Sequence, residues 1–168
     1  VACCRLPLSA PLPATGKELL DIGLVGVVYA PVMNELYIGK RNIGATLNGK
    51  PLNCADVNDL SQTIVALSFG KTDAAIDHMA NVAGKIAHRA QKVRSYGCAG
   101  LDISFVAGGR LGGSFYRGIH LWDIAAAGIV LAEAGGCLEA QRVPNGTWNM
   151  LAAPSGLYNE LLEIVHAA

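Results

Sequence analysis

The residues best placed to do chemistry lie in the segment from Trp122 to Gly136, which reads WDIAAAGIVLAEAGG. Asp123 stands at the start of this run, and small and aliphatic residues follow it. This pattern predicts a buried helix over residues 122–134. A carboxylate in a first helical turn stabilises the unpaired N–H groups there, and on a buried helix it also suits a divalent cation. The segment alone leaves two roles open for Asp123, a helix cap or a metal ligand.

The segments that must position Asp123 begin with a small antiparallel sheet. Its strands are predicted from short runs of β-branched and apolar residues, and the last strand closes at the turn dipeptide Asn48-Gly49. Residues 1–16 are rich in proline and indicate no clear element. The predicted strands of this meander cover residues 23–29, 34–38 and 44–47.

Later in the chain the pattern changes to strands that alternate with helices, which indicates βαβ units and a layered α/β sandwich. A soft boundary near residues 55–62 divides the chain into an N-terminal sheet domain, 1–58, and a C-terminal α/β domain, 59–168. The predicted strands of the second part cover residues 63–69, 92–96, 113–116, 137–140 and 150–153, and its predicted helices cover residues 72–91, 97–107, 122–134 and 155–166.

The composition limits the possible partners. The 168 residues are 52% hydrophobic and 15% charged, with a net charge of zero. A chain of this length can bury a core, and the lack of a basic excess argues against nucleic acid or an anionic membrane as a partner. No stretch reaches the roughly 18–20 apolar residues of a membrane span. Five cysteines without zinc-site spacing are typical of free thiols in a reducing cytosol, so we expect a cytoplasmic protein.

Residues 122–136 resemble the C-terminal signature of the inositol monophosphatase family, which comprises metal-dependent phosphatases of sugars and polyols. The Trp-Asp pair, the small residues at 125–127, the aliphatic residues at 129–131 and the final Gly-Gly pair all fit. Other segments agree in order and spacing, so the resemblance covers about residues 23–153. These segments are Gly26-Val27-Val28-Tyr29, Glu35-Leu36-Tyr37, Gly44-Ala45, Asn48-Gly49, Gly97-Cys98-Ala99, Val106-Ala107-Gly108-Gly109 and Gly118-Ile119-His120.

The resemblance implies a fold, a cofactor and a site. The fold would be a layered α-β-α-β-α sandwich, here a partial copy, and the cofactor would be Mg²⁺. Asp123 matches a catalytic magnesium ligand of the family, in which the metals activate a water for in-line attack on phosphorus. Gly97, Cys98 and Ala99 match a turn that contacts the substrate, and Tyr116 occupies a second substrate-binding position. The substrate would be a small phosphorylated polyol, sugar or nucleotide, and the protein would be a homo-oligomer, commonly a homodimer.

Two motifs that supply most of the family's metal ligands, a Glu-Glu pair and Asp-Pro-Ile-Asp-Gly-Thr, do not occur in the sequence. By the family's spacing the second motif would fall just before Val1, so we expect this chain to be the C-terminal part of the fold. One carboxylate does not assemble a multi-magnesium site, and we expect the chain alone to be inactive. Two hypotheses follow. The full-length protein is a Mg²⁺-dependent phosphatase, or the chain is a non-catalytic family member or fragment that acts as a binding or oligomerisation module.

Four further side chains carry specific expectations. Tyr116 replaces a glutamate that often contacts a polyol hydroxyl in the family, so it can form a hydrogen bond but brings no charge. Arg117 could meet a second phosphate, or it could be a solvated surface residue. Glu35 is expected to pair across the first hairpin, and Glu133 to have a structural role.

Overall fold

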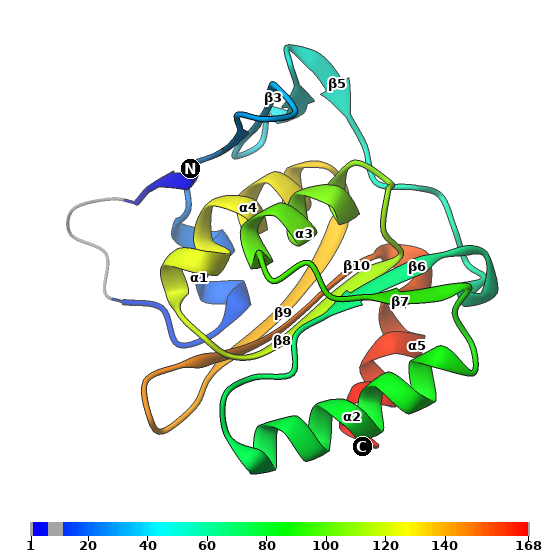
Figure 1. The fold of residues 1–168 in the computed structure, drawn as a ribbon. Coiled ribbons are helices and arrows are strands. Elements are labelled where there is room, and N and C mark those ends of the chain that lie inside the picture. The colour runs from blue at the N-terminus through cyan, green and yellow to red at the C-terminus, as the bar shows by residue number, and fades with distance from the viewer. Residues whose placement is uncertain (1, 7–11, 168) are drawn as a thin grey trace.

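The protein is described by a computed structural model that covers residues 2–6 and 12–167. In this part of the chain, ten strands form two five-stranded sheets, and five α-helices accompany them (Figure 1). Every strand and helix predicted from the sequence is present, with ends that differ by at most four residues. The largest difference is at the helix predicted over residues 72–91, which ends at Ala87 in the structure.

Sheet A is an antiparallel meander whose strands follow one another in chain order. Asn48 and Gly49 form the turn between its last two strands, and both have positive φ (51° and 78°), as the Asn-Gly dipeptide predicts. The structure adds one strand at each edge that the sequence pattern did not predict. The strands are β1 (Ala2–Arg5), β2 (Val25–Ala30), β3 (Glu35–Lys40), β4 (Gly44–Leu47) and β5 (Lys50–Leu52).

Sheet B is mixed and has the strand order β7-β6-β8-β10-β9. Its strand β6 pairs with β7 and β8 in parallel, whereas β10 pairs with β8 and β9 in antiparallel fashion. One helix, α1, was not predicted. The strands of sheet B are β6 (Ile64–Leu67), β7 (Lys92–Arg94), β8 (Gly113–Ile119), β9 (Gly136–Arg142) and β10 (Trp148–Pro154), and the helices are α1 (Gly16–Ile22), α2 (Asp73–Ala87), α3 (Ala99–Ala107), α4 (Leu121–Glu133) and α5 (Ser155–His166).

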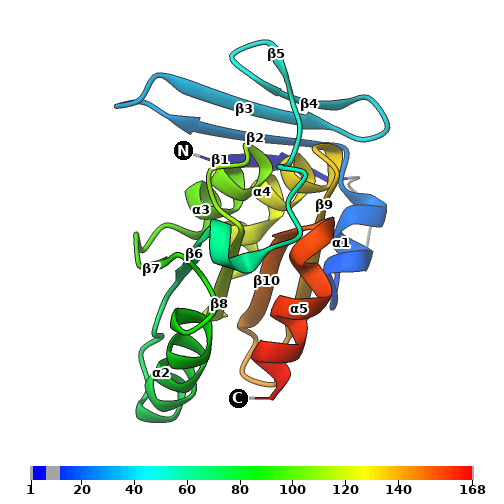
Figure 2. The ribbon, with the colours of Figure 1, turned by 90° about the vertical axis from the view of Figure 1, so that its right-hand side faces the viewer.

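The elements stack in layers, which Figure 2 shows from the side. Sheet A is the first layer, α1, α3 and α4 form the second, sheet B is the third, and α2 and α5 form the fourth. These are four of the five layers of an α-β-α-β-α sandwich. In the part of the chain that the structure describes, no helix covers the outer face of sheet A.

Helix α4 lies at the centre of this stack and fixes the position of Asp123. The helix contacts both sheets, and its residues 124–131 are all buried. Its small side chains let sheet A approach closely: a Cβ atom at Gly26 would collide with the backbone carbonyl of Ala126. Because α4 is held so tightly from both sides, its first turn is a rigid platform for Asp123.

Candidate functional site

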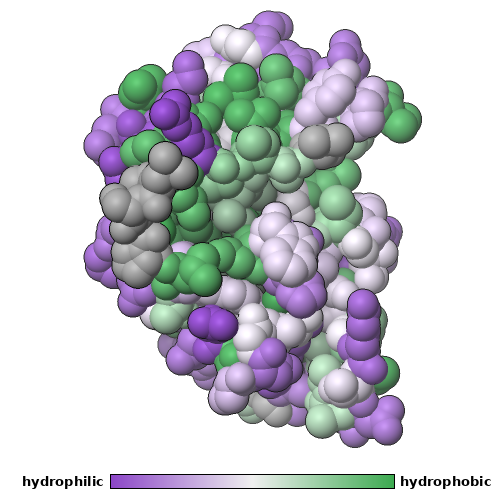
Figure 3. All heavy atoms as spheres, turned by 90° about the vertical axis from the view of Figure 1, so that its left-hand side faces the viewer, coloured by the Kyte–Doolittle hydropathy of each residue, from purple (hydrophilic) through white to green (hydrophobic). Residues whose placement is uncertain are grey.

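A cleft of about 600 Å³ opens between the β2–β3 turn of sheet A and the first turns of α3 and α4. Much of its wall is apolar, and Figure 3 shows a face of the molecule on which apolar side chains gather around a hollow. Residues from several separate segments therefore meet at this place. All five residues that the sequence predicts for the site line the cleft, namely Gly97, Cys98, Ala99, Tyr116 and Asp123.

Asp123 is the third residue of α4 and lies partly exposed at the cleft. Its Oδ2 accepts a hydrogen bond from the backbone N–H of His120 at 2.9 Å. The carboxylate therefore acts as part of a helix cap, which was one of its two possible roles. The cap does not exclude the second role, because the same side chain faces the cleft, and the assignment as a metal ligand stays a prediction.

The turn before α3 forms one edge of the cleft. Gly97 has a φ of +76°, a left-handed conformation that glycine adopts without strain. Cys98 is the N-cap residue of α3, with an exposed and free thiol and no side-chain capping hydrogen bond. Backbone N–H groups at such a helix start are suited to anionic or polar ligands. The turn can therefore bind a ligand through its backbone, and its role in substrate binding stays a prediction.

Tyr116 lies on β8 beneath α3 and is only 3% exposed. Its hydroxyl donates a hydrogen bond of 2.5 Å to Oδ2 of Asp102, which is fully buried on α3. Asp102 was not among the predicted site residues, although a lone acidic residue between Leu101 and Ile103 in an apolar helix was a usable signal. The structure thus places a carboxylate directly behind a residue predicted to bind substrate.

The electrostatics of this pair follow from its burial. Desolvation raises the pKa of Asp102 from 3.8 to about 6, although the hydrogen bond from Tyr116 acts in the opposite direction. Desolvation also raises the pKa of Tyr116, and the hydrogen bond to Asp102 adds to the rise. The nearby backbone of Cys98 lowers the same pKa to a smaller extent. Tyr116 therefore keeps its proton and links Asp102 to the turn before α3.

Arg117 is separated from the cleft although it follows Tyr116 directly. Successive side chains of a strand point to opposite faces, and Arg117 lines hollows with His78 and with Lys71 rather than the cleft. Arg117 therefore does not line the cleft itself, and its contact with a second phosphate stays a prediction. At the cleft mouth, Trp122 is 71% exposed and stacks on His120 with 4.2 Å between the ring centroids.

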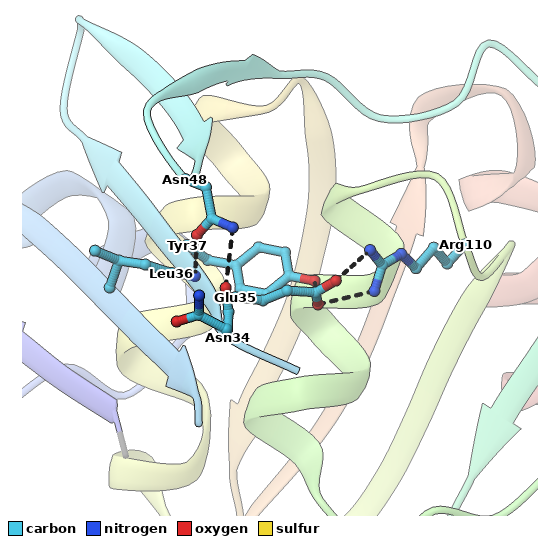
Figure 4. A network of polar contacts seen from close by, with 6 residues as sticks. All are labelled: Asn34, Glu35, Leu36, Tyr37, Asn48 and Arg110. Carbon is cyan, nitrogen blue, oxygen red and sulfur yellow. Dashed lines mark hydrogen bonds and ion pairs between the residues drawn. The ribbon is translucent and has the colours of Figure 1, made fainter. Parts of the chain in front are cut away.

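A second polar cluster joins sheet A to the segment between α3 and β8 (Figure 4). Both guanidinium nitrogens of Arg110 bind the carboxylate of Glu35, at 2.6 and 2.9 Å, and the Tyr37 hydroxyl donates to it at 2.7 Å. Glu35 was expected to pair across the first hairpin, and this expectation is wrong. Its partner lies 75 positions away because the layers bring β3 close to the end of α3. The Arg110 side chain also lies 5.1 Å above the Phe105 ring.

Glu133 at the end of α4 has the structural role that was expected. Its carboxylate accepts hydrogen bonds of 2.9 Å from the backbone N–H groups of Asn42 and Gly44, in the turn between β3 and β4. Together with the Glu35–Arg110 pair, this contact holds sheet A against the helices that carry the cleft.

The residues of this chain do not by themselves fit a multi-magnesium centre. Among the described residues, no group of three or more His, Cys, Asp or Glu side chains could hold a metal ion. Mg²⁺ requires near-octahedral oxygen coordination, and Asp123 offers a single carboxylate to the cleft. A magnesium site at Asp123 would therefore need ligands from outside the described residues.

Comparison with known proteins places these features in a family. The model of the inositol monophosphatase family matches residues 21–167. The sequence is 33% identical over 156 residues to the inositol-1-monophosphatase of Synechocystis, which covers 90% of this chain and 54% of that protein. It is 40% identical over 116 residues to the Nus factor SuhB of Escherichia coli K12, which covers 68% of this chain and 43% of that protein.

Solved structures agree with the sequence matches. The inositol monophosphatase of Anabaena superposes with a TM-score of 0.74 at 32% identity, which covers 87% of this chain and 60% of that one. SuhB of Mycobacterium tuberculosis gives a TM-score of 0.78 at 27% identity with the same coverage. The fold is that of a sugar-phosphatase-type α/β protein. The chain belongs to the inositol monophosphatase family and spans about half the length of the curated relatives it matches.

Several expectations remain open after these comparisons. The division into domains at residues 58 and 59, the oligomeric state, the cytoplasmic location and the lack of a nucleic-acid partner all stay predictions. No helix in the described part of the chain has the length and apolar character needed to cross a membrane.

Proposed function

We propose that this chain supplies the substrate-binding wall and one metal ligand, Asp123, of a magnesium-dependent phosphomonoesterase. The proposed substrate is a small phosphate ester of a polyol, a sugar or a nucleotide. One observation carries the proposal: the five residues that match the family's site positions, Gly97, Cys98, Ala99, Tyr116 and Asp123, come from three separate segments and line one cleft. Membership of the inositol monophosphatase family supports phosphatase chemistry in general.

The chain's own residues would bind and orient the substrate. The backbone N–H groups at the start of α3 would face the polar groups of the ligand, since a helix N-terminus favours them. The apolar wall, with Trp122 at its mouth, would exclude water from the bound ester. The remaining metal ligands would come from the part of the family's fold that lies outside this chain. Mg²⁺ would supply Lewis-acid stabilisation of the phosphate charge when it is bound.

The test is complementation of the chain with the missing half of a relative. The chain is co-expressed with the N-terminal segment of the Synechocystis inositol-1-monophosphatase that the match does not cover. Phosphate release from D-myo-inositol 1-phosphate is then measured with Mg²⁺ and after its removal by EDTA. We expect release only when both segments and Mg²⁺ are present, and no release by either segment alone.

Asp123→Asn tests the metal-ligand role within the same assay. Asparagine caps helices as well as aspartate does, so the helix should persist while phosphate release falls by about a hundredfold or more. Asp73→Asn is the matched control, because Asp73 lies in the first turn of α2, away from the cleft. Equal rates for Asp123→Asn and wild type would exclude the ligand role. A correctly assembled pair of segments that releases no phosphate would contradict the phosphatase proposal.

A second candidate function is that of a binding or oligomerisation module without catalysis. Exposed apolar residues at the cleft rim favour it, since Val32 is 99% exposed, Met33 43% and Trp122 71%. Contiguous apolar surface of this kind usually marks an interaction site. Light scattering on the chain alone should show dimers or larger species, and the double variant Val32→Ser/Met33→Ser should shift them towards monomer. A wild-type chain that is monomeric at all concentrations would argue against this module.

A further inference from the structure

We propose that Asp102 is a positioning residue that turns Tyr116 into a hydrogen-bond acceptor for a hydroxyl group of the ligand. This inference rests on the proposed function, because it assigns a role within the cleft that is proposed to bind the substrate.

The geometry directs the Tyr116 hydroxyl proton towards Asp102. The hydroxyl donates to Oδ2 of Asp102, and Asp102 lies on α3 while Tyr116 lies on β8. Both side chains are almost fully removed from water, at 0% and 3% exposure. A phenolic hydroxyl has a single proton to donate. As long as the carboxylate holds that proton, Tyr116 cannot donate a hydrogen bond into the cleft.

The oxygen of Tyr116 remains available as an acceptor. The backbone of Cys98, in the turn that edges the cleft, lies beside it. Tyr116 itself also lines the cleft, so a ligand group that meets its oxygen must bring a proton. A ligand hydroxyl satisfies this requirement, whereas a phosphate or carbonyl oxygen would meet an acceptor and be repelled. The arrangement therefore favours a ligand whose hydroxyl faces β8.

Asp102 supplies the charge that Tyr116 lacks. In the family a glutamate often stands at the position of Tyr116 and accepts from a polyol hydroxyl, as the resemblance described above implies. A hydroxyl that donates to a carboxylate becomes a stronger acceptor itself, because hydrogen bonds in a chain polarise one another. The buried Asp102 carboxylate thus acts on the ligand through Tyr116 and does not line the cleft itself.

A purely structural brace between α3 and β8 would not require a carboxylate. Among the described residues, Oδ1 of Asp102 has no hydrogen-bond partner, and its surroundings on α3 are apolar core residues such as Ile103 and Val106. Burial of an unpaired charge costs stability, and an asparagine would accept the same hydrogen bond without burying a charge. The negative charge is therefore the feature that packing does not explain and that ligand selectivity does.

The experiment compares two ligands of similar size that differ in their hydroxyl groups. Dissociation constants of D-myo-inositol 1-phosphate and cyclohexyl phosphate are measured at pH 8 by NMR titration of the full chain, without turnover. We expect Tyr116→Phe to shift the ratio of the two constants about tenfold towards cyclohexyl phosphate, as the loss of one charge-assisted hydrogen bond implies. Asp102→Asn should shift the ratio in the same direction. The double variant should add little, because Asp102 acts through Tyr116.

Tyr37→Phe is the matched control, because Tyr37 is another buried tyrosine that donates to a carboxylate but does not line the cleft. It should leave the ratio unchanged. A ligand-free measurement protects against a variant that folds poorly. With tyrosine labelled at the ring carbon that bears the hydroxyl, Asp102→Asn should move the Tyr116 resonance and leave that of Tyr37 in place.

The outcomes separate this inference from the proposed function. A ratio that Tyr116→Phe and Asp102→Asn leave unchanged, or a wild-type chain that binds neither ligand, overturns the positioning role. An unchanged Tyr116 resonance in Asp102→Asn overturns it as well. If the ratio shifts but the complemented protein releases no phosphate, the positioning role stands and the phosphatase proposal falls.

Discussion

Two buried tyrosines of the described residues, Tyr116 and Tyr37, each donate a hydrogen bond to a carboxylate, and the two pairs differ in one component. At the cleft, Tyr116 donates to Asp102, and no cation accompanies the pair among the hydrogen bonds and ion pairs of the described residues. At the junction of sheet A with the end of α3, Tyr37 donates to Glu35, and Arg110 binds the same carboxylate through two nitrogens. The two carboxylates therefore have opposite pKa shifts. Burial raises the pKa of Asp102, whereas the hydrogen bond from Arg110 lowers that of Glu35.

The presence or absence of the arginine determines which pair stabilises the fold and which destabilises it. A carboxylate that a guanidinium binds in bidentate fashion is stabilised in its charged form. A buried carboxylate that has only a tyrosine loses more from desolvation than it gains from one hydrogen bond. The Glu35 cluster thus acts as a brace between layers, and the Asp102 pair is a place where stability is sacrificed. Such places cluster at functional sites.

The largest effect that would test this comparison is the pH dependence of Asp102. Between pH 4 and about 6 the native state retains a proton that the unfolded chain has lost, so the free energy of unfolding falls as pH rises. Asp102→Asn removes this contribution. The stability of the variant relative to wild type should therefore increase by about 2 kcal/mol between pH 4 and pH 8. Urea denaturation across this range measures the difference.

Asp77→Asn serves as the control for this prediction, because Asp77 is an exposed carboxylate on α2. Its stability relative to wild type should change little with pH. A difference between Asp102→Asn and wild type that stays constant from pH 4 to pH 8 would contradict the assigned pKa shift. The expected gain in stability, combined with a loss of ligand selectivity, would place Asp102 among residues that trade stability for function.

Much of the fold could be predicted from the sequence because local periodicity and turn chemistry determine it. The Asn48-Gly49 turn and the small-residue helix α4 are clear in the pattern and are present in the structure. Helix α1 was missed, although Thr15 and Glu18 have the spacing of a capping box in the sequence. In the structure the Thr15 hydroxyl accepts from the Glu18 N–H, and the Glu18 carboxylate accepts from the Ala14 N–H. Proline-rich neighbours concealed that signal.

The site could be predicted only in part, because long-range partners leave no local trace. The five residues predicted for the site, Gly97, Cys98, Ala99, Tyr116 and Asp123, do line one cleft. The partners of Glu35 and Tyr116 were not found, since Arg110 and Asp102 meet them only through the stacking of the layers. Likewise, Arg117 and Tyr116 are neighbours in the sequence but point to opposite faces of the sheet, because side chains alternate along a strand.

The next effect in size comes from the removal of each tyrosine hydroxyl. Tyr116→Phe leaves the buried Asp102 carboxylate without its hydrogen bond, which should cost about 1–3 kcal/mol of stability at pH 8. Tyr37→Phe should cost only about 0.5 kcal/mol, because Glu35 keeps both of its bonds to Arg110. Urea denaturation of the two variants under identical conditions provides the comparison. Equal costs would mean that the arginine does not distinguish the two pairs.

The smallest effect is the removal of the arginine, which converts the Glu35 cluster into a copy of the Asp102 pair. Arg110→Met keeps apolar contact with Phe105 but leaves Glu35 with the Tyr37 hydroxyl alone. Because Arg110 is 43% exposed and water screens the pair, we expect a loss of about 1 kcal/mol at pH 7.

The pH dependence of this loss has the opposite sign to that of Asp102. Glu35 has a lowered pKa in the folded state, so its stabilisation is present above its ordinary pKa of 4.5 and is lost as the pH falls through the folded value. The stabilisation that Arg110 gives through Glu35 should therefore be lost in acid, so the difference in stability between Arg110→Met and wild type should shrink. For Asp102 it is a destabilisation that is lost in acid, because the buried carboxylate is neutralised. In the Glu35→Gln background, Arg110→Met should cost little further stability, because the ion pair is already absent. A difference that stays constant below pH 4 would show that Arg110 acts mainly through Phe105 and not through Glu35.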